Sequence, residues 1–561
     1  MIPAVERRCE RMRGGPIFPN ILNENHLVDS LENCQTLVGH SGCVNTLRWN
    51  KSGTLLASGS DDRTVKIWRA ERLQTSIETG HEGNVFAVEF LPSSADGQLV
   101  TGAADRAIFV HDLETSQKIK LEADGRIKRI CTVEQAPFCF WAASERDGRV
   151  LQVDTRTMEP EPVVQYGPTN PHEVQVKSVA ISEANSYLLA VCYDETPVRL
   201  FDRRNFDEPI LTFEPVDTTP LMYHSTHASF NKLGTELVVN QGCGGGVVVF
   251  SLDSEKDPRV LERLQNVLAS PGEPAIASGS LPYPELREQG STTIRAKQFE
   301  KAIDFYSGMI EKRDPDRAFH SICYSNRATA LLMRRQKGDT YACIRDAVRA
   351  LEIHGGNSKA MFRLCKALQV LELNVLAKQC IEKYKEVFPK EADAIEHIEK
   401  QVDLLGGPRQ DDDDDEDDEE NPARCIDYYQ RFTGPVNHQT DIKEANFFGS
   451  RDQYVVAGSD CGHMYIWNRD TSRLMGIWQA DNSILNIVQP HPDAFLIASS
   501  GIDEEIRLWQ PLLERPDEYE SKKLEDPFDF LEKKTRGDMM NGMRMHVIRD
   551  FARQNPQCLQ S

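Results

Sequence analysis

Short apolar runs separated by polar turns fill residues 31–255, stop, and resume from residue 425 to residue 512. Runs of this kind with Gly-rich turns between them predict β-strands. From residue 282 to residue 395, apolar and small residues instead recur at helical spacing. The pattern therefore predicts a strand-rich body that is interrupted by a helical domain.

Within the strand-rich part, four residue types recur in a fixed register. In the first copy His40, Ser58 and Asp62 lie 28, 10 and 6 residues before Trp68, which is the register of a WD repeat. The Trp position recurs at intervals of 43, 42, 48, 49, 217 and 42 residues, at His111, Val153, Phe201, Phe250, Trp467 and Trp509. Six intervals predict seven blades, five before the long interval and two after it.

The recurring residues can form a buried chain of hydrogen bonds from the Trp indole through Ser and His to the Asp carboxylate. Such a chain ties the strands of a blade together, and each charge-assisted link is worth about 1.5–3 kcal/mol. We therefore interpret His40, Ser58, Asp62 and Trp68 as a structural tetrad and not as catalytic groups. In blade two His111 replaces the Trp.

Residues 282–395 fit the 34-residue tetratricopeptide template, in which each repeat is a pair of helices. Three repeats are marked by Gly290, Phe299, Ala302 and Tyr306, by Tyr324, Ala328 and Ala350, and by Cys365, Leu368, Ala377, Tyr384 and Pro389. The predicted fold is a seven-bladed all-β WD-repeat propeller with an inserted all-α tetratricopeptide-repeat domain between blades five and six. The first helices of such pairs line a groove that binds extended peptides.

Four residues of this predicted groove resemble a clamp for peptide carboxylates. Tetratricopeptide domains that capture chaperone C-termini use a Lys and an Asn in helix one, an Asn in helix three, and Lys-x-x-x-Arg in helix five. The matching residues here are Arg287, Asn326, Lys359 and Arg363, with Ser291 in place of the first Asn. Residues four apart share a helix face, so Lys359 and Arg363 can reach one carboxylate. The alternative is that all four are ordinary solvated residues.

A second constellation lies where blades three and four end, in DTR at 154–156 and DRR at 202–204. Propellers that serve as substrate receptors of cullin-4 ubiquitin ligases carry an aromatic-Asp-x-Arg box there, and its Arg reaches the damaged-DNA-binding adaptor subunit. This resemblance implies that Asp154, Arg156, Asp202 and Arg204 bind the adaptor. An arginine suits the role because its planar, permanently charged fork can bind two acceptors at once.

Composition changes this interpretation little. Ten acids at residues 411–420 account for much of the net charge of −22 and leave −12 on the rest of the chain. Such a run predicts a disordered linker, with a histone tail or another basic partner as the alternative. The sequence shows no domain-sized basic surface, so nucleic-acid binding is not predicted. The sequence contains no run of eighteen apolar residues, so no membrane span is predicted.

Enzymatic and metal signatures are not found in the sequence. Fourteen cysteines include no Cys-x-x-Cys pair, so neither a disulfide framework nor a zinc site is predicted, and a reducing compartment, the cytoplasm or nucleus, is expected. There is no GxxxxGK[ST] loop, no HExxH and no GxSxG. We therefore expect no catalytic residues, no metal and no cofactor.

The combination of these parts resembles the adipose family of WD- and tetratricopeptide-repeat proteins over residues 36 to about 510. The segments HQTDIKEANFFGSRDQYVVAGSDCGHMYIW and QPHPDAFLIASSGIDEEIRLW carry much of the likeness. The resemblance implies a non-catalytic receptor that recruits substrate proteins to a cullin-4 RING ligase, with links to histones, histone deacetylase and restraint of fat storage. The alternative is a chaperone-linked or chromatin-corepressor scaffold that binds peptides or histones without ligase partnership.

These observations divide the chain into seven predicted segments. They are an N-terminal segment (1–30), blades one to five (31–255), a linker (256–281), three tetratricopeptide repeats (282–395), an acidic linker (396–424), blades six and seven (425–512) and a charged tail (513–561).

Overall fold

The computed structural model describes residues 24–70, 72–145, 148–165, 174–194, 197–213, 224–242, 246–252, 260–270, 273, 284–311, 316–335, 339–371, 373–405, 424–426, 428, 430–469, 471–512, 520–531 and 533–534. These residues form two compact units. The propeller unit holds the described residues up to Ser270 and from Asp403 to Lys523, and the helical unit holds the others.

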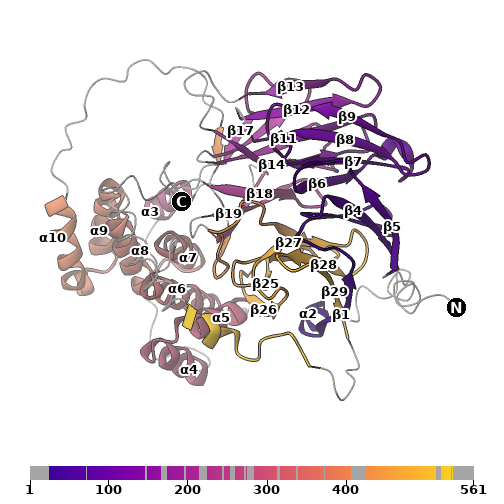
Figure 1. Ribbon diagram of the computed structural model, residues 1–561. Coiled ribbons are helices and arrows are strands. Elements are labelled where there is room, and N and C mark those ends of the chain that lie inside the picture. Colours follow the sequence, from indigo (N-terminus) through magenta and orange to yellow (C-terminus); the bar gives the residue numbers. More distant parts are fainter. Residues whose placement is uncertain are drawn as a thin grey trace, which may run out of the picture. The chain divides into compact units, whose positions relative to one another are not determined.

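The propeller unit is built from seven sheets, which Figure 1 shows as successive blades. In order from the inner to the outer strand they are β2 (Val44–Trp49), β3 (Leu56–Ser60), β4 (Thr64–Arg69), β5 (Arg72–Glu78); β6 (Val85–Phe90), β7 (Gln98–Ala103), β8 (Ala107–Asp112), β9 (Lys118–Glu122); β10 (Ile127–Thr132), β11 (Cys139–Ser144), β12 (Arg149–Asp154), β13 (Pro160–Val164); β14 (Val176–Ile181), β15 (Leu188–Tyr193), β16 (Val198–Asp202), β17 (Leu211–Phe213), β21 (Arg424–Ile426); β18 (Ser225–Phe230), β19 (Glu236–Gln241), β20 (Gly246–Ser251), β22 (Gln430–Phe432); β23 (Ala445–Phe448), β24 (Tyr454–Ala457), β25 (His463–Asn468), β26 (Leu474–Gln479); and β27 (Leu485–Pro490), β28 (Ile497–Gly501), β29 (Glu505–Pro511), β1 (Leu31–Val38).

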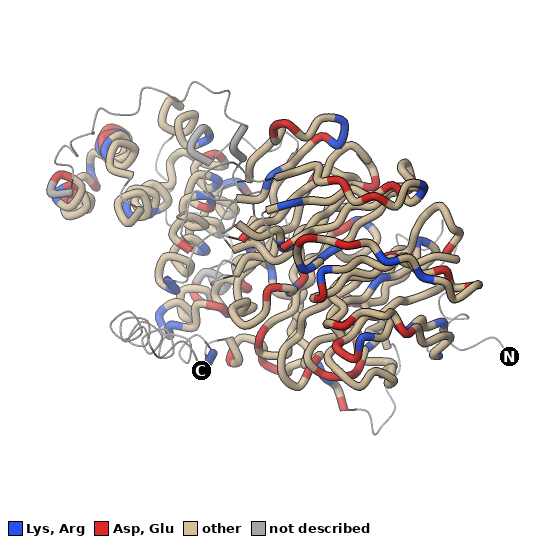
Figure 2. Tube along the Cα trace, turned by 45° about the horizontal axis from the view of Figure 1, so that its top comes forward, with Lys and Arg blue, Asp and Glu red and all other residues tan. Residues whose placement is uncertain are grey.

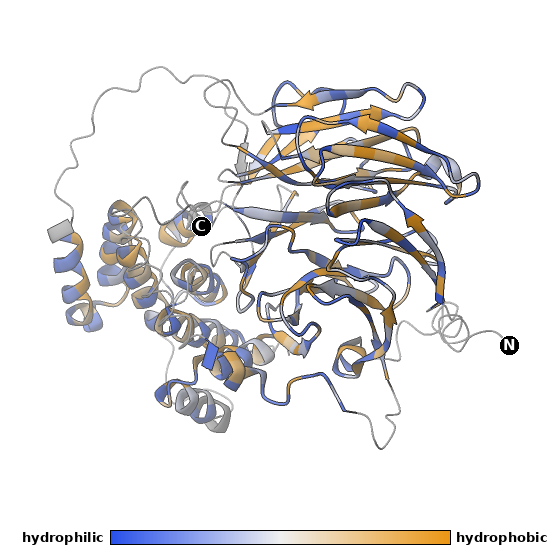
Figure 3. Ribbon diagram, viewed as in Figure 1, coloured by the Kyte–Doolittle hydropathy of each residue, from blue (hydrophilic) through white to orange (hydrophobic). Residues whose placement is uncertain are grey.

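The seven sheets form a closed ring. Their inner strands contact one another in the order β2, β6, β10, β14, β18, β23 and β27, and β27 contacts β2 again. The middle strands are largely buried on both faces, and β19 and β20 are also rich in Val. Apolar residues gather along these strands in Figure 3. Burial between neighbouring blades therefore holds the ring together. The predicted fold class is confirmed.

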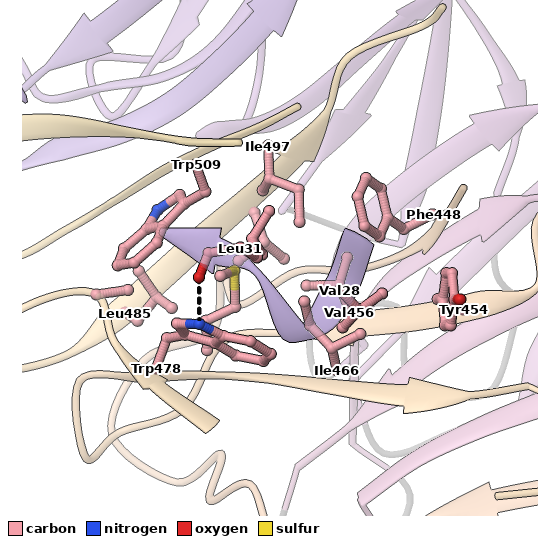
Figure 4. Close-up of a cluster of buried hydrophobic side chains, with 13 residues drawn as sticks. Val28, Leu31, Phe448, Tyr454, Val456, Ile466, Trp478, Leu485, Ile497 and Trp509 are labelled. Atoms are coloured by element: carbon pink, nitrogen blue, oxygen red, sulfur yellow. Dashed lines mark hydrogen bonds between the residues drawn. The ribbon is translucent and has the colours of Figure 1, made fainter. Parts of the chain in front are cut away.

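The first strand of the chain closes the ring by completing the last sheet. Strand β1 pairs antiparallel with β29, and Leu31 lies opposite Pro511. The indole N–H of Trp478 donates to the Leu31 carbonyl at 2.9 Å, and both residues are fully buried. Val28, on the short helix α2 (Glu24–Asp29), joins the same apolar cluster (Figure 4). Segments from opposite ends of the chain thus share one core.

The insertion interrupts the fifth sheet. The chain leaves the propeller after β20 and returns through β21, which pairs in parallel with β17, and β22, which pairs with β20. The outer strand of this sheet therefore follows the insertion. A WD sequence repeat ends at the third strand of a blade, so an interruption between the fifth and sixth repeats places the insertion before that outer strand.

The helical unit consists mainly of three consecutive helix pairs. They are α4 (Pro284–Arg295) with α5 (Phe299–Glu311), α6 (Arg317–Arg334) with α7 (Asp339–Ile353), and α8 (Ser358–Val370) with α9 (Asn374–Val387), followed by a 3₁₀ helix (Pro389–Ile395) and α10 (Glu396–Leu405). Each of the helices α4 to α9 contacts the next. The template residues Ala302, Ala328, Ala350, Leu368 and Ala377 are fully buried. The four alanines among them have small side chains, which let paired helices approach closely.

One connecting segment contains a helix that the sequence analysis does not predict. Helix α3 (Val260–Ala269) lies inside the segment 256–281 that the sequence predicts as a linker, and its Leu264 is fully buried. The apolar face of α3 stabilises this helix, although the Pro-rich sequence that follows it does not suggest one. The acidic run 411–420 and residues 535–561 of the predicted tail lie outside the described residues.

Candidate functional site

The predicted tetrad residues of blade one lie in direct contact. The indole N–H of Trp68 donates to Ser58 Oγ at 2.9 Å, Ser58 Oγ lies 2.8 Å from His40 Nε2, and His40 Nδ1 lies 2.8 Å from Asp62. Burial alone would raise the pKa of Asp62, but hydrogen bonds from Thr64 and His40 lower it to about 2. Burial lowers the pKa of His40 and outweighs the effect of Asp62. Both ring nitrogens of His40 thus take part in hydrogen bonds within the blade.

Blade two builds the same chain with a second histidine in place of the Trp. His81 Nδ1 lies 3.0 Å from Asp105, its Nε2 lies 2.9 Å from Thr101 Oγ1, and Thr101 Oγ1 lies 2.9 Å from His111 Nε2. Burial, with the neighbouring His81, lowers the pKa of His111 to about 4. A neutral His111 can donate from Nε2 as an indole does, so the substitution preserves the connection.

Blade seven keeps only the Trp–Ser end of the hydrogen-bond chain. The indole N–H of Trp509 donates to Ser499 Oγ at 2.8 Å. Asp481, which replaces the histidine, instead accepts from the backbone N–H groups of Ser483 at 2.8 Å and Asp503 at 3.1 Å. The serine hydroxyl of this blade thus serves one hydrogen bond of the type seen in blade one instead of two.

The Asp-x-Arg pairs of blades three and four adopt the same geometry twice. Asp154 ends β12 and Asp202 ends β16, and in each case the arginine two residues later turns back toward the carboxylate. Arg156 Nε donates to Asp154 Oδ1 at 2.9 Å, and Arg204 Nε donates to Asp202 Oδ1 at 2.9 Å. These bonds lower the pKa of each aspartate to about 2. The arginine side chains remain 67% and 65% exposed.

Each exposed arginine also lies over an exposed aromatic ring. The guanidinium carbon of Arg156 is 5.2 Å from the ring centre of Phe138, and that of Arg204 is 4.2 Å from the ring centre of Tyr187. Phe138 and Tyr187 are 43% and 47% exposed. They directly precede β11 and β15, the second strands of their sheets. We call Arg156, Arg204, Phe138 and Tyr187 the arginine–aromatic face.

The four residues share one face for a topological reason. In an antiparallel sheet the turn between strands one and two and the turn between strands three and four lie at the same end. Backbone hydrogen bonds join the two turns in each blade: Thr155 N–H donates to the Phe138 carbonyl at 2.7 Å, and Arg203 N–H donates to the Tyr187 carbonyl at 2.8 Å. The sequence analysis missed both rings. The signal that marks them is an aromatic residue directly before the second strand in two consecutive blades.

The adjacent Arg203 has a different position from Arg204. Its guanidinium lies over the ring of Trp141 in blade three at 4.5 Å, and it donates to the carbonyl of Ser186. Burial lowers its pKa. Arg203 therefore joins blades three and four, while Arg204 faces outward.

The four predicted clamp residues are only partly brought together. Arg363 on α8 donates to Ser325 Oγ on α6. Asn326 and Ser291 lie beside the hydroxyl of Tyr306. Lys359 is exposed, and the side chain of Arg287 lies outside the described side chains. Ser325 and Tyr306 were not in the predicted set.

Buried charges near the propeller axis form a network that sequence patterns do not reveal. Arg129 on β10 forms an ion pair with Glu444 and donates from Nη2 toward His227 Nε2, 3.0 Å away. Gln489 donates to Glu444 at 2.6 Å. Burial lowers the pKa of His227 to about 3. The network joins blades three, five and seven to the segment that leads into blade six.

Several general features were also compared with the sequence-based expectations. In Figure 2 the positions of Lys and Arg are interspersed with those of Asp and Glu along the coloured trace. Within the described part of the chain, no helix is long and apolar enough to cross a membrane. The same residues include no group of three or more His, Cys, Asp or Glu side chains arranged to hold a metal ion.

Comparisons with known proteins agree with this architecture. The family model "WD domain, G-beta repeat" matches residues 31–69 and 72–112. The chain is 32% identical to WD and tetratricopeptide repeats protein 1 of Homo sapiens, over 86% of this chain and 85% of that protein, and 31% identical to its Mus musculus counterpart with the same coverage. It is 26% identical to Protein ALTERED SEED GERMINATION 2 of Arabidopsis thaliana, over 87% of this chain and 88% of that protein.

A further match covers only a short segment of the chain. The chain is 48% identical to DDB1- and CUL4-associated factor 6 of Homo sapiens over 83 residues, which cover 15% of this chain and 9% of that protein. A propeller joined to helical repeats is a scaffold for protein–protein interactions. By identity and coverage, this chain belongs to the family of WD and tetratricopeptide repeats protein 1.

Proposed function

We propose that this protein is a non-catalytic substrate receptor of a cullin-4 RING ubiquitin ligase. In this proposal the arginine–aromatic face docks on the damaged-DNA-binding adaptor subunit of the ligase. Substrate proteins are recruited by the helical unit or by the opposite face of the propeller. The single observation that carries the proposal is the Asp–Arg–aromatic unit, repeated in two consecutive blades with both arginines and both rings exposed.

The geometry of this unit suits a protein interface. A free arginine side chain loses rotamer freedom when it binds, which opposes association. Here each guanidinium is already held by an aspartate and lies over a ring, so less freedom remains to be lost. Arg and Tyr are also the residue types that contribute most to interfaces, commonly 2 kcal/mol or more each when they lie at the centre. The short match to DDB1- and CUL4-associated factor 6 is consistent with this partner, because that protein is named for the association.

Co-immunoprecipitation of the adaptor tests the proposal. The test variant is the full-length double substitution Arg156→Ala and Arg204→Ala. The control is the double substitution Arg69→Ala and Arg72→Ala, which removes two exposed arginines from the turn between β4 and β5 of blade one, at the same end of the propeller. We expect the control to recover the adaptor like the wild type and the test variant to recover at most about one tenth. Equal recovery by all three proteins would refute the docking face.

The alternative function is a scaffold without ligase partnership, which binds chaperone C-terminal peptides, histones or a histone deacetylase. One observation favours it: the partly exposed Arg363 in the helical unit has no acidic partner among the described side chains. The same experiment separates the two functions, because a scaffold without ligase partnership would not recover the adaptor in the wild type or in either variant. A location in cytoplasm and nucleus remains a prediction under either function.

A further inference from the structure

Three sulfur atoms meet inside the last helix pair of the helical unit. Cys380 Sγ on α9 lies 3.8 Å from Met361 Sδ on α8. The thiol of Cys365, also on α8, is a hydrogen-bonding partner of the Cys380 thiol. Both cysteines are fully buried, and Met361 is 3% exposed. We call Met361, Cys365 and Cys380 the sulfur cluster.

Helix geometry brings the three side chains together. Met361 and Cys365 are four residues apart on α8, so their side chains lie on one face of that helix. Helix α9 packs against α8 and contributes Cys380. A search for Cys-x-x-Cys pairs does not reveal this arrangement, because one sulfur belongs to a methionine and the two cysteines lie on different helices.

The donor atoms of the cluster suit a soft monovalent metal ion. Thiolates and thioethers are soft ligands of the kind that bind Cu(I), Zn²⁺ and iron–sulfur clusters. Structural zinc sites and iron–sulfur clusters take four protein ligands, mostly Cys and His. Within the described residues, no group of three or more His, Cys, Asp or Glu side chains could supply such a set. Of these metal centres, the sulfur cluster therefore fits Cu(I).

The spacing of the sulfur atoms fits three-coordinate binding. Metal–sulfur bonds are about 2.3 Å long, so three sulfurs around one ion in a plane lie about 4.0 Å from one another. The distance of 3.8 Å between Cys380 Sγ and Met361 Sδ is close to this value. One ion can therefore bind between the sulfurs with only small movements of the side chains.

Burial keeps the thiol of Cys365 protonated in the free protein. Burial raises the pKa of Cys365 well above its ordinary value, and the hydrogen bond with Cys380 raises it further. A thiol that coordinates a metal ion loses its proton. Metal binding and proton release are therefore coupled at this site.

We propose that the sulfur cluster binds one Cu(I) ion, with Cys365 and Cys380 as thiolate ligands and Met361 as a thioether ligand. The bound ion links α8 to α9 within the third helix pair. This site is independent of the arginine–aromatic face and does not depend on ligase partnership.

The first test counts Cu(I) ions taken by the reduced full-length protein from the bis(bicinchoninate) complex under argon, followed by the visible absorbance of that complex. The test variant is the double substitution Cys365→Ala and Cys380→Ala. The control is Cys323→Ala and Cys343→Ala, which removes two other buried cysteines of the helical unit. Cysteines elsewhere in the chain contribute equally to all three proteins. We expect the wild type and the control to take up about one equivalent more than the test variant.

A second variant removes one sulfur and conserves the volume of the side chain. Met361→Leu is a swap that apolar cores tolerate well, so the fold should be retained, which far-ultraviolet circular dichroism checks. We expect its Cu(I) affinity to be at least about tenfold lower than that of the wild type. The control Met333→Leu, at a methionine of α6 that is 47% exposed, should bind like the wild type.

X-ray absorption at the copper K-edge gives a criterion that a purely structural role of these residues would not affect. Loaded with one equivalent, the wild type should show three sulfur neighbours at about 2.3 Å, and the Met361→Leu variant should show two. Equal uptake of Cu(I) by the wild type and the Cys365→Ala, Cys380→Ala variant would overturn the proposal. If that variant does not fold, Met361→Leu decides: unchanged affinity and an unchanged number of sulfur neighbours would overturn the three-sulfur site.

Discussion

Replacing Ser58 by alanine should destabilise the propeller more than the equivalent substitution in blade seven. Because the pKa of Asp62 is near 2, its carboxylate is ionised at neutral pH and only accepts hydrogen bonds, so His40 Nδ1 donates to it. The neutral ring then accepts at Nε2 from the Ser58 hydroxyl, whose oxygen accepts from Trp68. Ser58→Ala therefore leaves two buried groups without their partners. Ser499→Ala leaves only the Trp509 indole.

The magnitude follows from these counts. An unsatisfied buried polar group costs about 1–3 kcal/mol, so Ser58→Ala should cost about 2–6 kcal/mol and Ser499→Ala about 1–3 kcal/mol. Both serines are fully buried, so the cavity left by the lost oxygen is comparable. The difference between the two variants therefore isolates the histidine link of blade one.

Tryptophan fluorescence during urea unfolding measures this difference in the full-length protein. All six tryptophans lie in the propeller unit, so unfolding of the helical unit does not contribute tryptophan signal. We expect the free energy of unfolding to fall by about 1–3 kcal/mol more for Ser58→Ala than for Ser499→Ala. If Ser58→Ala costs no more than Ser499→Ala, the hydrogen-bond chain through His40 does not stabilise the blade, and the reasoning fails.

Two further outcomes are expected. The folded-state pKa of Asp62, about 2, lies below its ordinary value of 3.8, so its ionised carboxylate contributes about 2 kcal/mol of stability above pH 4, and this contribution is lost as the pH falls toward 2. In acid unfolding followed by fluorescence, the Asp62→Asn variant should lack this part of the pH dependence. An unchanged pH profile would contradict the assignment. Trp478→Phe removes the hydrogen bond to Leu31 and should cost about 1–3 kcal/mol and speed amide hydrogen exchange in β1, as measured by mass spectrometry. Trp467→Phe, at an equally buried ring without a described hydrogen bond to its indole N–H, is the control, and equal exchange in both variants would show that the bond does not hold β1.

The periodic parts of the fold could be predicted from the sequence because each blade repeats the same local requirements. The spacing of Trp68, His111 and Trp509 locates the third strands even where the tetrad is incomplete. Helical periodicity and small residues such as Ala328 locate the helix pairs. The position of the insertion before the outer strand of the fifth sheet requires knowledge of which strand each repeat contributes to which blade, and the strand pairing supplies this.

The candidate site was less predictable because its members meet only after folding. Arg156 and Arg204 stand in a recognisable motif, but Phe138 and Tyr187 approach them across a turn and carry no motif of their own. Arg129 and Glu444 are 315 positions apart, so no local pattern connects them.

The position of the insertion also has a consequence for biosynthesis. About 170 residues separate the end of β20 from the start of β21, and a ribosome needs on the order of 10–30 s to add them. During that interval the helical repeats can fold, while the fourth and fifth sheets lack β21 and β22 and β1 lacks its partner β29. The unpaired strand edges favour aggregation. Completion of the ring must wait for β29 to meet β1. We therefore expect the newly made protein to depend on molecular chaperones until translation is nearly finished.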